Sequence, residues 1–311
     1  MRPTTTHAGQ SCGGIERGST MTSDATGATA APGAAGSDVT TEVRLTTHPD
    51  DMDTLSPAAL RARVLVDDLF VPGELKFVLS HHDRILIGGA MPSGGSLEVT
   101  APQEIKAQHL CDRRELGVVC LAGSGTVTAD DDELPMAPES IAYLGQGTRR
   151  VTLSGDAVFY LVSAPAHRRH PTVVRTRDEA EAVPVGDAGK AGARTIRKYV
   201  HQDGIASCEL ALGITTLEPG SVWNTMPCHT HDRRTEVYLY FDLPADERVV
   251  HLCGRPDNTR SVIVADRQAV INPPWSVHFG AGTAPYKFIW STAGENLAYD
   301  DMDSVATAEL R

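Results

Sequence analysis

Short runs of β-branched and other apolar residues, separated by Gly, Pro and Asp, recur from about residue 65 to the end of the chain. In the first half these runs are LKFVLS, RILIGGAM, LGVVCLAGSGTVTA, SIAYLG, RVTLSG and AVFYLVSA. In the second half they are CELALGITTLE, EVYLYFDL, RVVHLC, SVIVA, AVINPP and KFIWST. Regular short strands with turn residues between them are typical of an antiparallel sandwich or barrel. The chain is therefore predicted to be mainly β, with a few short helices.

Segments of different composition divide the chain. Residues 1–40 are rich in Thr, Ser, Ala and Gly and offer little to bury, so they are predicted to be a disordered extension. Ordered structure is expected to begin near Leu55, where SPAALRARVLV combines a serine cap with a proline in the first helical turn. The polar residues 166–198 are predicted to connect two β-rich domains, which span residues 50–165 and 199–311.

The two halves share a short internal repeat. PESIAYLGQG aligns with PPWSVHFGAG, which places Tyr143 opposite His278. The motif DRRE, which ends at Glu115, likewise resembles DRRTE, which ends at Glu236. Both matches occur in the same order in each half. Two copies of one β-barrel are therefore predicted.

The stretch CHTHDRRTEVYLYFD places two histidines one residue apart and a glutamate five residues later. On a strand, alternate side chains point the same way, so His229 and His231 share a face. Glu236 has the opposite parity, and DRRT must therefore form a turn or bulge that resets the register. After that turn, Glu236, Tyr238 and Tyr240 are predicted to face one side of the strand.

Imidazole and carboxylate groups together suit Zn²⁺, Fe²⁺, Mn²⁺ or Ni²⁺. Two surface histidines and an ion-paired glutamate would explain His229, His231 and Glu236 without any metal. A fourth ligand is expected on a later strand, and His278 in PPWSVHFG has a suitable place. With His278 present, the pattern favours a metal site.

Longer blocks of the chain carry a resemblance to a known family. These blocks are SHHDRILIGGAMP, RRELGVVCLAGSGTVT, WNTMPCHTHDRRTEVYLYFD, WSVHFGAGT and FIWSTAGENLAYDDMD. Over residues 50 to 311 the chain resembles the 5-keto-4-deoxyuronate isomerase family, the ketol-isomerases of pectin catabolism. The resemblance implies a bicupin of two jelly-roll barrels. It also implies that the second barrel holds one Zn²⁺ through His229, His231, Glu236 and His278.

The activity that the resemblance implies is conversion of 5-dehydro-4-deoxy-D-glucuronate to 3-deoxy-D-glycero-2,5-hexodiulosonate. A divalent metal can stabilise the enediolate of such a reaction as a Lewis acid. Three alternatives remain at this point. They are the 5-deoxy-glucuronate isomerase of inositol catabolism, a cupin dioxygenase, and a storage or sugar-sensing protein without turnover.

Four residues are candidates for binding a uronate substrate. Arg84 and Arg233 could neutralise its carboxylate, for which a guanidinium is the matched partner, and Arg234 beside them has the same capacity. Tyr240 could offer a hydroxyl to the cavity. Ordinary surface ion pairs and a core tyrosine are the alternatives.

The first half shows a poorer set of ligands. If Glu115 corresponds to Glu236, the two histidine positions fall on Gln108 and Leu110, and Tyr143 takes the last one. One carboxylate without imidazoles is a poor site for these metals. The first barrel is therefore predicted to lack a metal.

Bulk composition excludes other functions. The net charge of −12 argues against a nucleic-acid partner, because phosphate binding requires a basic surface. No apolar run approaches the ~20 residues that span a bilayer, and the N-terminus lacks a secretory signal. The six cysteines are scattered and are expected to be free thiols, so a cytoplasmic location is predicted. The family resemblance implies a homohexamer.

Overall fold

The computed structural model of the chain describes residues 39–295 and 297–311. Strands make up 49% of the structure and helices 11%, so the prediction of a mainly β protein is confirmed. The predicted disordered extension lies, up to residue 38, outside the described residues. The expectation that ordered structure begins near Leu55 is wrong, because β1 (Thr40–Arg44) pairs in parallel with β3 (Leu75–Ser80). The sequence TTEVR is too short and too polar to have indicated this strand.

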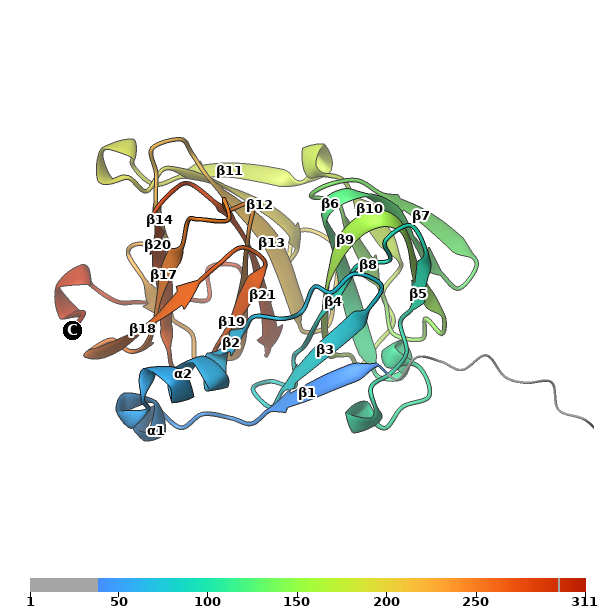
Figure 1. Cartoon of the computed structure of the whole chain (residues 1–311), viewed down its shortest axis with the longest axis horizontal. Coiled ribbons are helices and arrows are strands. Elements are labelled where there is room, and N and C mark those ends of the chain that lie inside the picture. The colour runs from blue at the N-terminus through green and yellow to red at the C-terminus, as the bar shows by residue number, and fades with distance from the viewer. Residues whose placement is uncertain (1–38, 296) are drawn as a thin grey trace, which may run out of the picture. The chain divides into compact units, whose positions relative to one another are not determined.

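The first half forms a nine-stranded sheet with the order β1-β3-β4-β9-β6-β8-β10, in which β5 pairs with β9 and β7 with β6 (Figure 1). Its other strands are β4 (Leu86–Ala90), β5 (Ser96–Glu98), β6 (Arg114–Ala129), β7 (Asp132–Met136), β8 (Ile141–Leu144), β9 (Val151–Pro165) and β10 (Val173–Arg175). The 3₁₀ helices η1 (Gln103–Ile105) and η2 (Leu110–Asp112) precede β6. All pairs in this sheet except β1 with β3 are antiparallel.

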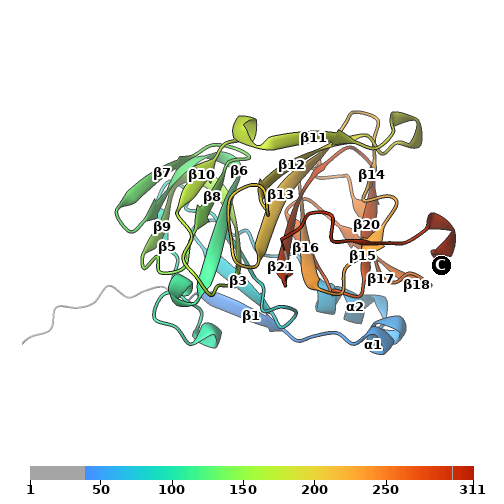
Figure 2. The same ribbon diagram turned by 180° about the vertical axis from the view of Figure 1, so that it is seen from behind.

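The second half contains three sheets, seen from behind in Figure 2. The largest has the order β11-β12-β13-β21-β16-β19-β2 and contains β2 (Leu65–Val66), β11 (Glu181–Val185), β12 (Arg194–Val200), β13 (Leu210–Leu217), β16 (Arg234–Phe241), β19 (Gln268–Asn272) and β21 (Lys287–Gly294). A second sheet has the order β14-β20-β17-β18 and contains β14 (Trp223–Asn224), β17 (Val249–Arg255), β18 (Asn258–Val264) and β20 (Val277–Gly282). The third pairs β15 (His229–Thr230) with β22 (Asp303–Ser304).

Two short helices lie beside the second half. They are α1 (Pro49–Thr54), which contacts β17, and α2 (Pro57–Val64), which contacts β18 and β19. The predicted start of α2 is confirmed: Ser56 is the N-cap, and its hydroxyl accepts a hydrogen bond from the Ala59 N–H. In the described part of the chain, no helix is long and apolar enough to cross a bilayer.

The segment predicted to connect the halves contributes strands to both. β10 forms an edge of the first sheet, and β11 and β12 form an edge of the large sheet of the second half. The 3₁₀ helices η3 (Arg177–Glu179) and η4 (Ala188–Lys190) lie between these strands, and η5 (Thr307–Glu309) follows β22. The predicted domain ranges of 50–165, 166–198 and 199–311 stay predictions.

Alternation along the strands separates three large cores. On β16, Val237 and Leu239 join a core shared by the two largest sheets, whereas Tyr238 and Tyr240 face the interior of the second half. On β6 of the first half, Val119 faces the shared core. The neighbouring side chains Leu116, Val118 and Cys120 pack inside the first half. A one-residue alternation thus decides which side chains join the halves and which fill each interior.

Glu115 and Tyr143 face the core shared by the two halves and do not form the remnant of a metal site. The Tyr143 hydroxyl donates to Glu115 Oε2 at 2.6 Å. The same carboxylate accepts hydrogen bonds of 2.7–2.8 Å from the backbone N–H groups of Cys208, Glu209 and Leu210, which belong to the second half. Glu115 is fully buried. It therefore fastens the start of β13 to the first sheet.

The alignment of Tyr143 with His278 is wrong. Tyr143 lies on β8, whose neighbours are β6 and β10, whereas His278 lies on β20, whose neighbours are β14 and β17. The short match between PESIAYLGQG and PPWSVHFGAG reflects shared turn residues rather than equivalent strands.

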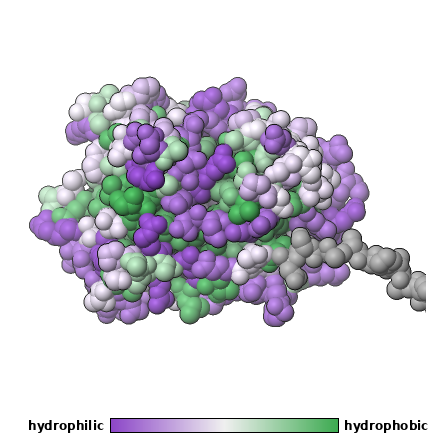
Figure 3. Space-filling model, in the orientation of Figure 1, coloured by the Kyte–Doolittle hydropathy of each residue, from purple (hydrophilic) through white to green (hydrophobic). Residues whose placement is uncertain are grey.

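Hydrophilic residues make up most of the face seen in Figure 3, and hydrophobic residues emerge between them in separate patches. In the described residues, the exposed large hydrophobic side chains are Val43, Leu45, Ile263 and Met302. Isolated exposed apolar residues of this kind are ordinary on a soluble protein surface.

Replacing Glu115 by Ala should destabilise the junction between the halves. Three backbone N–H groups and one phenol would lose their acceptor, and leaving such groups unpaired costs about 1–3 kcal/mol each. We expect calorimetry to show a melting temperature lower by roughly 5 °C or more. Tyr143→Phe removes one donor only and should have a much smaller effect. Bound metal should be unchanged in both variants; a loss of metal, or an unchanged melting temperature for Glu115→Ala, would contradict this account.

Candidate metal centre

The predicted turn between the histidines and the glutamate is present. β15 ends at Thr230, Asp232 and Arg233 form a turn, and β16 begins at Arg234. The turn resets the register, so that Glu236 enters the interior of the second half on the same face as Tyr238. The parity argument from the sequence is confirmed.

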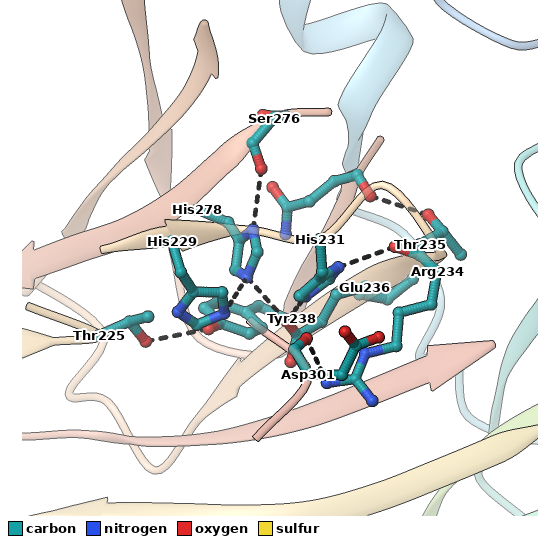
Figure 4. A network of polar contacts seen from close by, with 12 residues as sticks. Thr225, His229, His231, Arg234, Thr235, Glu236, Tyr238, Ser276, His278 and Asp301 are labelled. Atoms are coloured by element: carbon teal, nitrogen blue, oxygen red, sulfur yellow. Dashed lines mark hydrogen bonds and ion pairs between the residues drawn. The ribbon is translucent and has the colours of Figure 1, made fainter. Parts of the chain in front are cut away.

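Four side chains from three strands and a connecting loop converge at this place (Figure 4). Ligand atoms of His229, His231, Glu236 and His278 all lie within 4.8 Å of one another. Glu236 Oε2 lies 3.0 Å from His231 Nε2 and 2.7 Å from His278 Nε2. His278 Nε2 in turn lies 3.1 Å from His229 Nε2. The structure therefore brings together all four ligands that the sequence predicts.

Backbone carbonyls orient two of the imidazoles. His231 Nδ1 lies 2.8 Å from the Arg234 carbonyl oxygen, and His278 Nδ1 lies 3.0 Å from that of Ser276. A carbonyl can only accept, so each Nδ1 carries the proton. Each Nε2 is then directed at the centre of the group, as in metal sites where a partner on the far nitrogen fixes the ring.

A positive charge at the centre of the group would stabilise its acceptor atoms. His231 presents one nitrogen to a carbonyl and the other to the Glu236 carboxylate, so both nitrogens face acceptors. Burial is the largest single effect and lowers the pKa of His231, but the hydrogen bond to Glu236 and the charge of that carboxylate together outweigh it and raise the pKa of the imidazole. Burial would likewise raise the pKa of Glu236, but His278 and His231 hold that pKa well below its usual range. A divalent cation would satisfy the same acceptors, so the residues fit a metal ion.

His229 is suited to bind as a neutral ligand. Burial, followed by the neighbouring His278, lowers the pKa of His229 to about 3. The imidazole is therefore unprotonated at neutral pH, which is the state that coordinates a metal.

Three members of the group, His229, His231 and Glu236, line a cavity of about 370 Å³, and His278 is fully buried beside them. Small-molecule sites in proteins fall in the range that begins near ~300 Å³. The other lining residues are Val185, Arg194, Ile196, His201, Ala211, Thr215, Thr225, Pro227, Cys228, Arg234, Tyr238, Phe288, Trp290, Thr292, Tyr299, Met302 and Ser304. Aromatic and aliphatic walls thus surround a few polar groups, as is usual for such sites.

Of the residues predicted to bind substrate, Arg84, Arg233 and Tyr240 lie outside this lining, whereas Arg234 is part of it. Arg84 is exposed at the turn between β3 and β4 of the first sheet. Arg233 forms ion pairs with Asp301 and Asp303 at 2.7 and 2.8 Å. Tyr240 is buried, and its hydroxyl lies 2.8 Å from His251 Nδ1. Arg233 and Tyr240 are thus engaged with other partners, and Arg84 is on the surface of the first half.

The arginines of the DRRT turn hold a C-terminal segment over the site. Arg233 binds the carboxylates of Asp301 and Asp303, while Arg234 donates to the carbonyls of Ala298 and Asp301. β22 then pairs with β15, which carries His229. This segment supplies Tyr299, Met302 and Ser304 to the cavity wall, and sequence alone gave no sign of that contact.

Arg194 is the functional candidate that sequence reasoning missed. It opens β12 and lines the cavity, yet it lies in the polar segment that was interpreted as a connection. A weak alternation in ARTIRKYV, with Ile196 two residues on, was the available signal.

Comparisons with known proteins agree with this geometry. Residues 67–307 match the KduI/IolB family. The chain is 48% identical over 278 residues to the 4-deoxy-L-threo-5-hexosulose-uronate ketol-isomerase of Kineococcus radiotolerans, covering 87% of this chain and 100% of that protein. It is 46% identical over 277 residues to the protein of the same name from Burkholderia cenocepacia, with the same coverage.

The chain belongs to the KduI/IolB family.

Solved structures support the fold of this family member. An IolB-like protein from Salmonella typhimurium aligns with a TM-score of 0.59 at 18% identity, covering 71% of this chain and 86% of that one. Oxalate decarboxylase from Lactobacillus farciminis aligns with a TM-score of 0.51 at 9% identity, covering 71% of this chain and 79% of that one. At such low identity the likeness concerns the fold alone, and it fits the predicted bicupin.

Replacing His231 by Ala should abolish tight metal binding. The variant loses one imidazole from the group, and the remaining three ligands would be completed by water at best. Elemental analysis of the purified wild type should find close to one divalent ion per chain, and of the variant far less. His109→Ala, in the loop before η2 of the first half, is the control and should keep its metal. Two ions per chain in the wild type would contradict a metal-free first half.

Proposed function

We propose that this member of the KduI/IolB family is a ketol-isomerase that converts 5-dehydro-4-deoxy-D-glucuronate to 3-deoxy-D-glycero-2,5-hexodiulosonate. The observation that carries the proposal is the convergence of three imidazoles and one carboxylate, of which His229, His231 and Glu236 line a cavity of small-molecule size. Relatives 41–48% identical over most of the chain, named 4-deoxy-L-threo-5-hexosulose-uronate ketol-isomerase, support the same activity.

The reaction moves a carbonyl between adjacent carbons without net oxidation. A proton must leave the carbon beside the aldehyde, and negative charge develops on two neighbouring oxygens. When bound, a divalent metal supplies a Lewis acid for those oxygens. We propose that His229, His231, Glu236 and His278 hold this metal. The carbonyls of Arg234 and Ser276 keep two of the rings in the ligating tautomer.

The rest of the cavity controls solvent and orientation. Phe288, Trp290 and Tyr299 form an aromatic wall that limits the access of water and so strengthens electrostatic interactions inside. Thr225 and Tyr238 share a hydrogen bond of 2.9 Å between their hydroxyls at the same cavity. Burial places the pKa of Tyr238 well above its usual value, so its hydroxyl remains a hydrogen-bonding group.

Zinc is proposed as the ion, with one per chain. Three imidazoles and one carboxylate are ligands that Zn²⁺ accepts readily, and the chemistry needs no change of oxidation state. A dioxygenase would require a redox-active metal and an oxidisable substrate. The names of the relatives also favour the proposed reaction over the 5-deoxy-glucuronate isomerase of inositol catabolism.

Turnover by the purified protein tests the activity. Metal-loaded protein should convert 5-dehydro-4-deoxy-D-glucuronate, seen by NMR as loss of the aldehyde signal and appearance of the ketone. Removing the metal with a chelator should abolish turnover, and zinc should restore it. 5-Deoxy-glucuronate serves as the comparison substrate. If the protein converts only 5-deoxy-glucuronate, that compound is the substrate in place of the proposed one. If the protein converts neither compound, the proposed activity is refuted.

A cytoplasmic homohexamer is proposed as the working form, on the basis of the family resemblance and of the scattered cysteines. Light scattering at micromolar protein should give a mass near six times the 33.2 kDa of one chain. A mass of one chain would contradict the assembly, and cell fractionation tests the location.

A further inference from the structure

Arg194 stands apart from the other arginines near the site. Its side chain is partly buried and lines the same cavity as the metal ligands. Its Nη1 donates to the Gly192 carbonyl oxygen at 2.8 Å. In the described part of the chain, no carboxylate lies within ion-pair distance of it, and the electrostatic neighbours that affect it are tyrosines.

Two other arginines of the second half show what is unusual about Arg194. Arg233 and Arg255 have partly exposed side chains, and each forms ion pairs with two aspartates. Arg194 is in a more enclosed place, where an unbalanced charge is more costly. Burial lowers the pKa of Arg194, but a guanidinium stays charged at neutral pH. The cavity therefore contains a cation without an anionic partner from the described chain.

Two further polar groups in the cavity wall also lack partners. The Trp290 indole N–H and the Thr292 hydroxyl are buried, with 6% and 3% of these residues exposed. Neither atom hydrogen bonds to any of the described residues. Buried donors of this kind are nearly always satisfied in folded proteins, by the protein, by water or by a ligand.

The strand arrangement places these groups on one side of the cavity. Trp290 and Thr292 are alternate residues of β21, and Arg194 lies on β12. β13 separates the two strands and pairs with both. Trp290 packs against Gly213 of β13, where an added Cβ would lie only 2.1 Å from the indole ring. The close approach that this glycine permits fixes the position of the indole.

We propose that Arg194 binds the carboxylate of the substrate and that Trp290 and Thr292 bind its uncharged oxygens. The guanidinium would make the cavity selective for sugar acids over neutral sugars, because its fork of N–H donors matches a carboxylate. This inference rests on the proposed ketol-isomerase activity and adds the means by which a uronate is distinguished.

The test uses two substrates and three variants of the full-length, metal-loaded protein. The substrates are 5-dehydro-4-deoxy-D-glucuronate and its neutral analogue, in which a hydroxymethyl group replaces the carboxylate. Arg194→Ala should raise KM for the uronate about 10- to 100-fold, because hydrogen bonds to charged groups contribute at that level, and leave KM for the neutral analogue nearly unchanged. Arg197→Ala, on the same strand but outside the cavity lining, is the control and should behave as wild type. Trp290→Phe should raise KM for both substrates.

Chemical rescue separates binding from a structural role. Millimolar guanidinium should restore part of the uronate activity of Arg194→Ala, at a concentration that leaves the melting temperature of the variant unchanged. Equal losses on both substrates without rescue would overturn the assignment of Arg194. So would a uronate KM that stays at the wild-type value. Absence of turnover by the wild type would instead refute the proposed activity, so the two failures are distinguishable.

Discussion

The Glu236 carboxylate, buried against the Nε2 atoms of His231 and His278, is the interaction on which the functional half of the molecule depends. A carboxylate in such a place requires a positive charge close by, either as protons on the imidazoles or as a metal ion. Each of the four side chains comes from a different local structure: a short strand, a connecting loop, the start of a longer strand and a strand of another sheet. The group that could hold a metal ion therefore ties together elements that share few backbone hydrogen bonds.

The C-terminal segment is organised around the same group. The turn that sets the register of Glu236 also presents Arg233 and Arg234, and these two arginines bind residues 298–303. The segment so fixed supplies part of the cavity wall. One short sequence, DRRT, thus positions both the Glu236 carboxylate and the C-terminal segment at the cavity wall. Of its two arginines, only Arg234 lines the cavity, whereas Arg233 is paired with Asp301 and Asp303.

The fold class and the shared face of His229, His231 and Glu236 could be predicted from the sequence because both depend on local periodicity, whereas His278 was predicted from its motif on a later strand. Alternation along a strand, together with the parity break between His231 and Glu236, was enough to place the histidines and the carboxylate on one face. The lining of the cavity could not be predicted in this way. Arg194 and Tyr299 reach the site from segments far apart in the chain, and only the packing of β12 and the C-terminal segment brings them there.

The error in the first half shows how one residue of register changes the conclusion. β6 begins at Arg114 and β16 at Arg234, and both arginines are buried and donate to backbone carbonyls. Two residues on, Leu116 and Glu236 face the interiors of their halves. Leu116, and not Glu115, therefore occupies the position that corresponds to Glu236.

A shift of one residue turns a side chain to the opposite face of a strand. Glu115 consequently faces the shared core, where it binds the backbone of the second half. The interior position that corresponds to Glu236 is apolar and packs against Leu-, Val- and Phe-rich neighbours. A hydrocarbon side chain cannot ligate a cation, so the first half builds a core where the second half builds a charged group. The two halves therefore differ in what they bury at this position: the first half buries a hydrocarbon core, and the second half buries a carboxylate beside three imidazoles. Glu115 joins the two halves through the backbone before and at the start of β13.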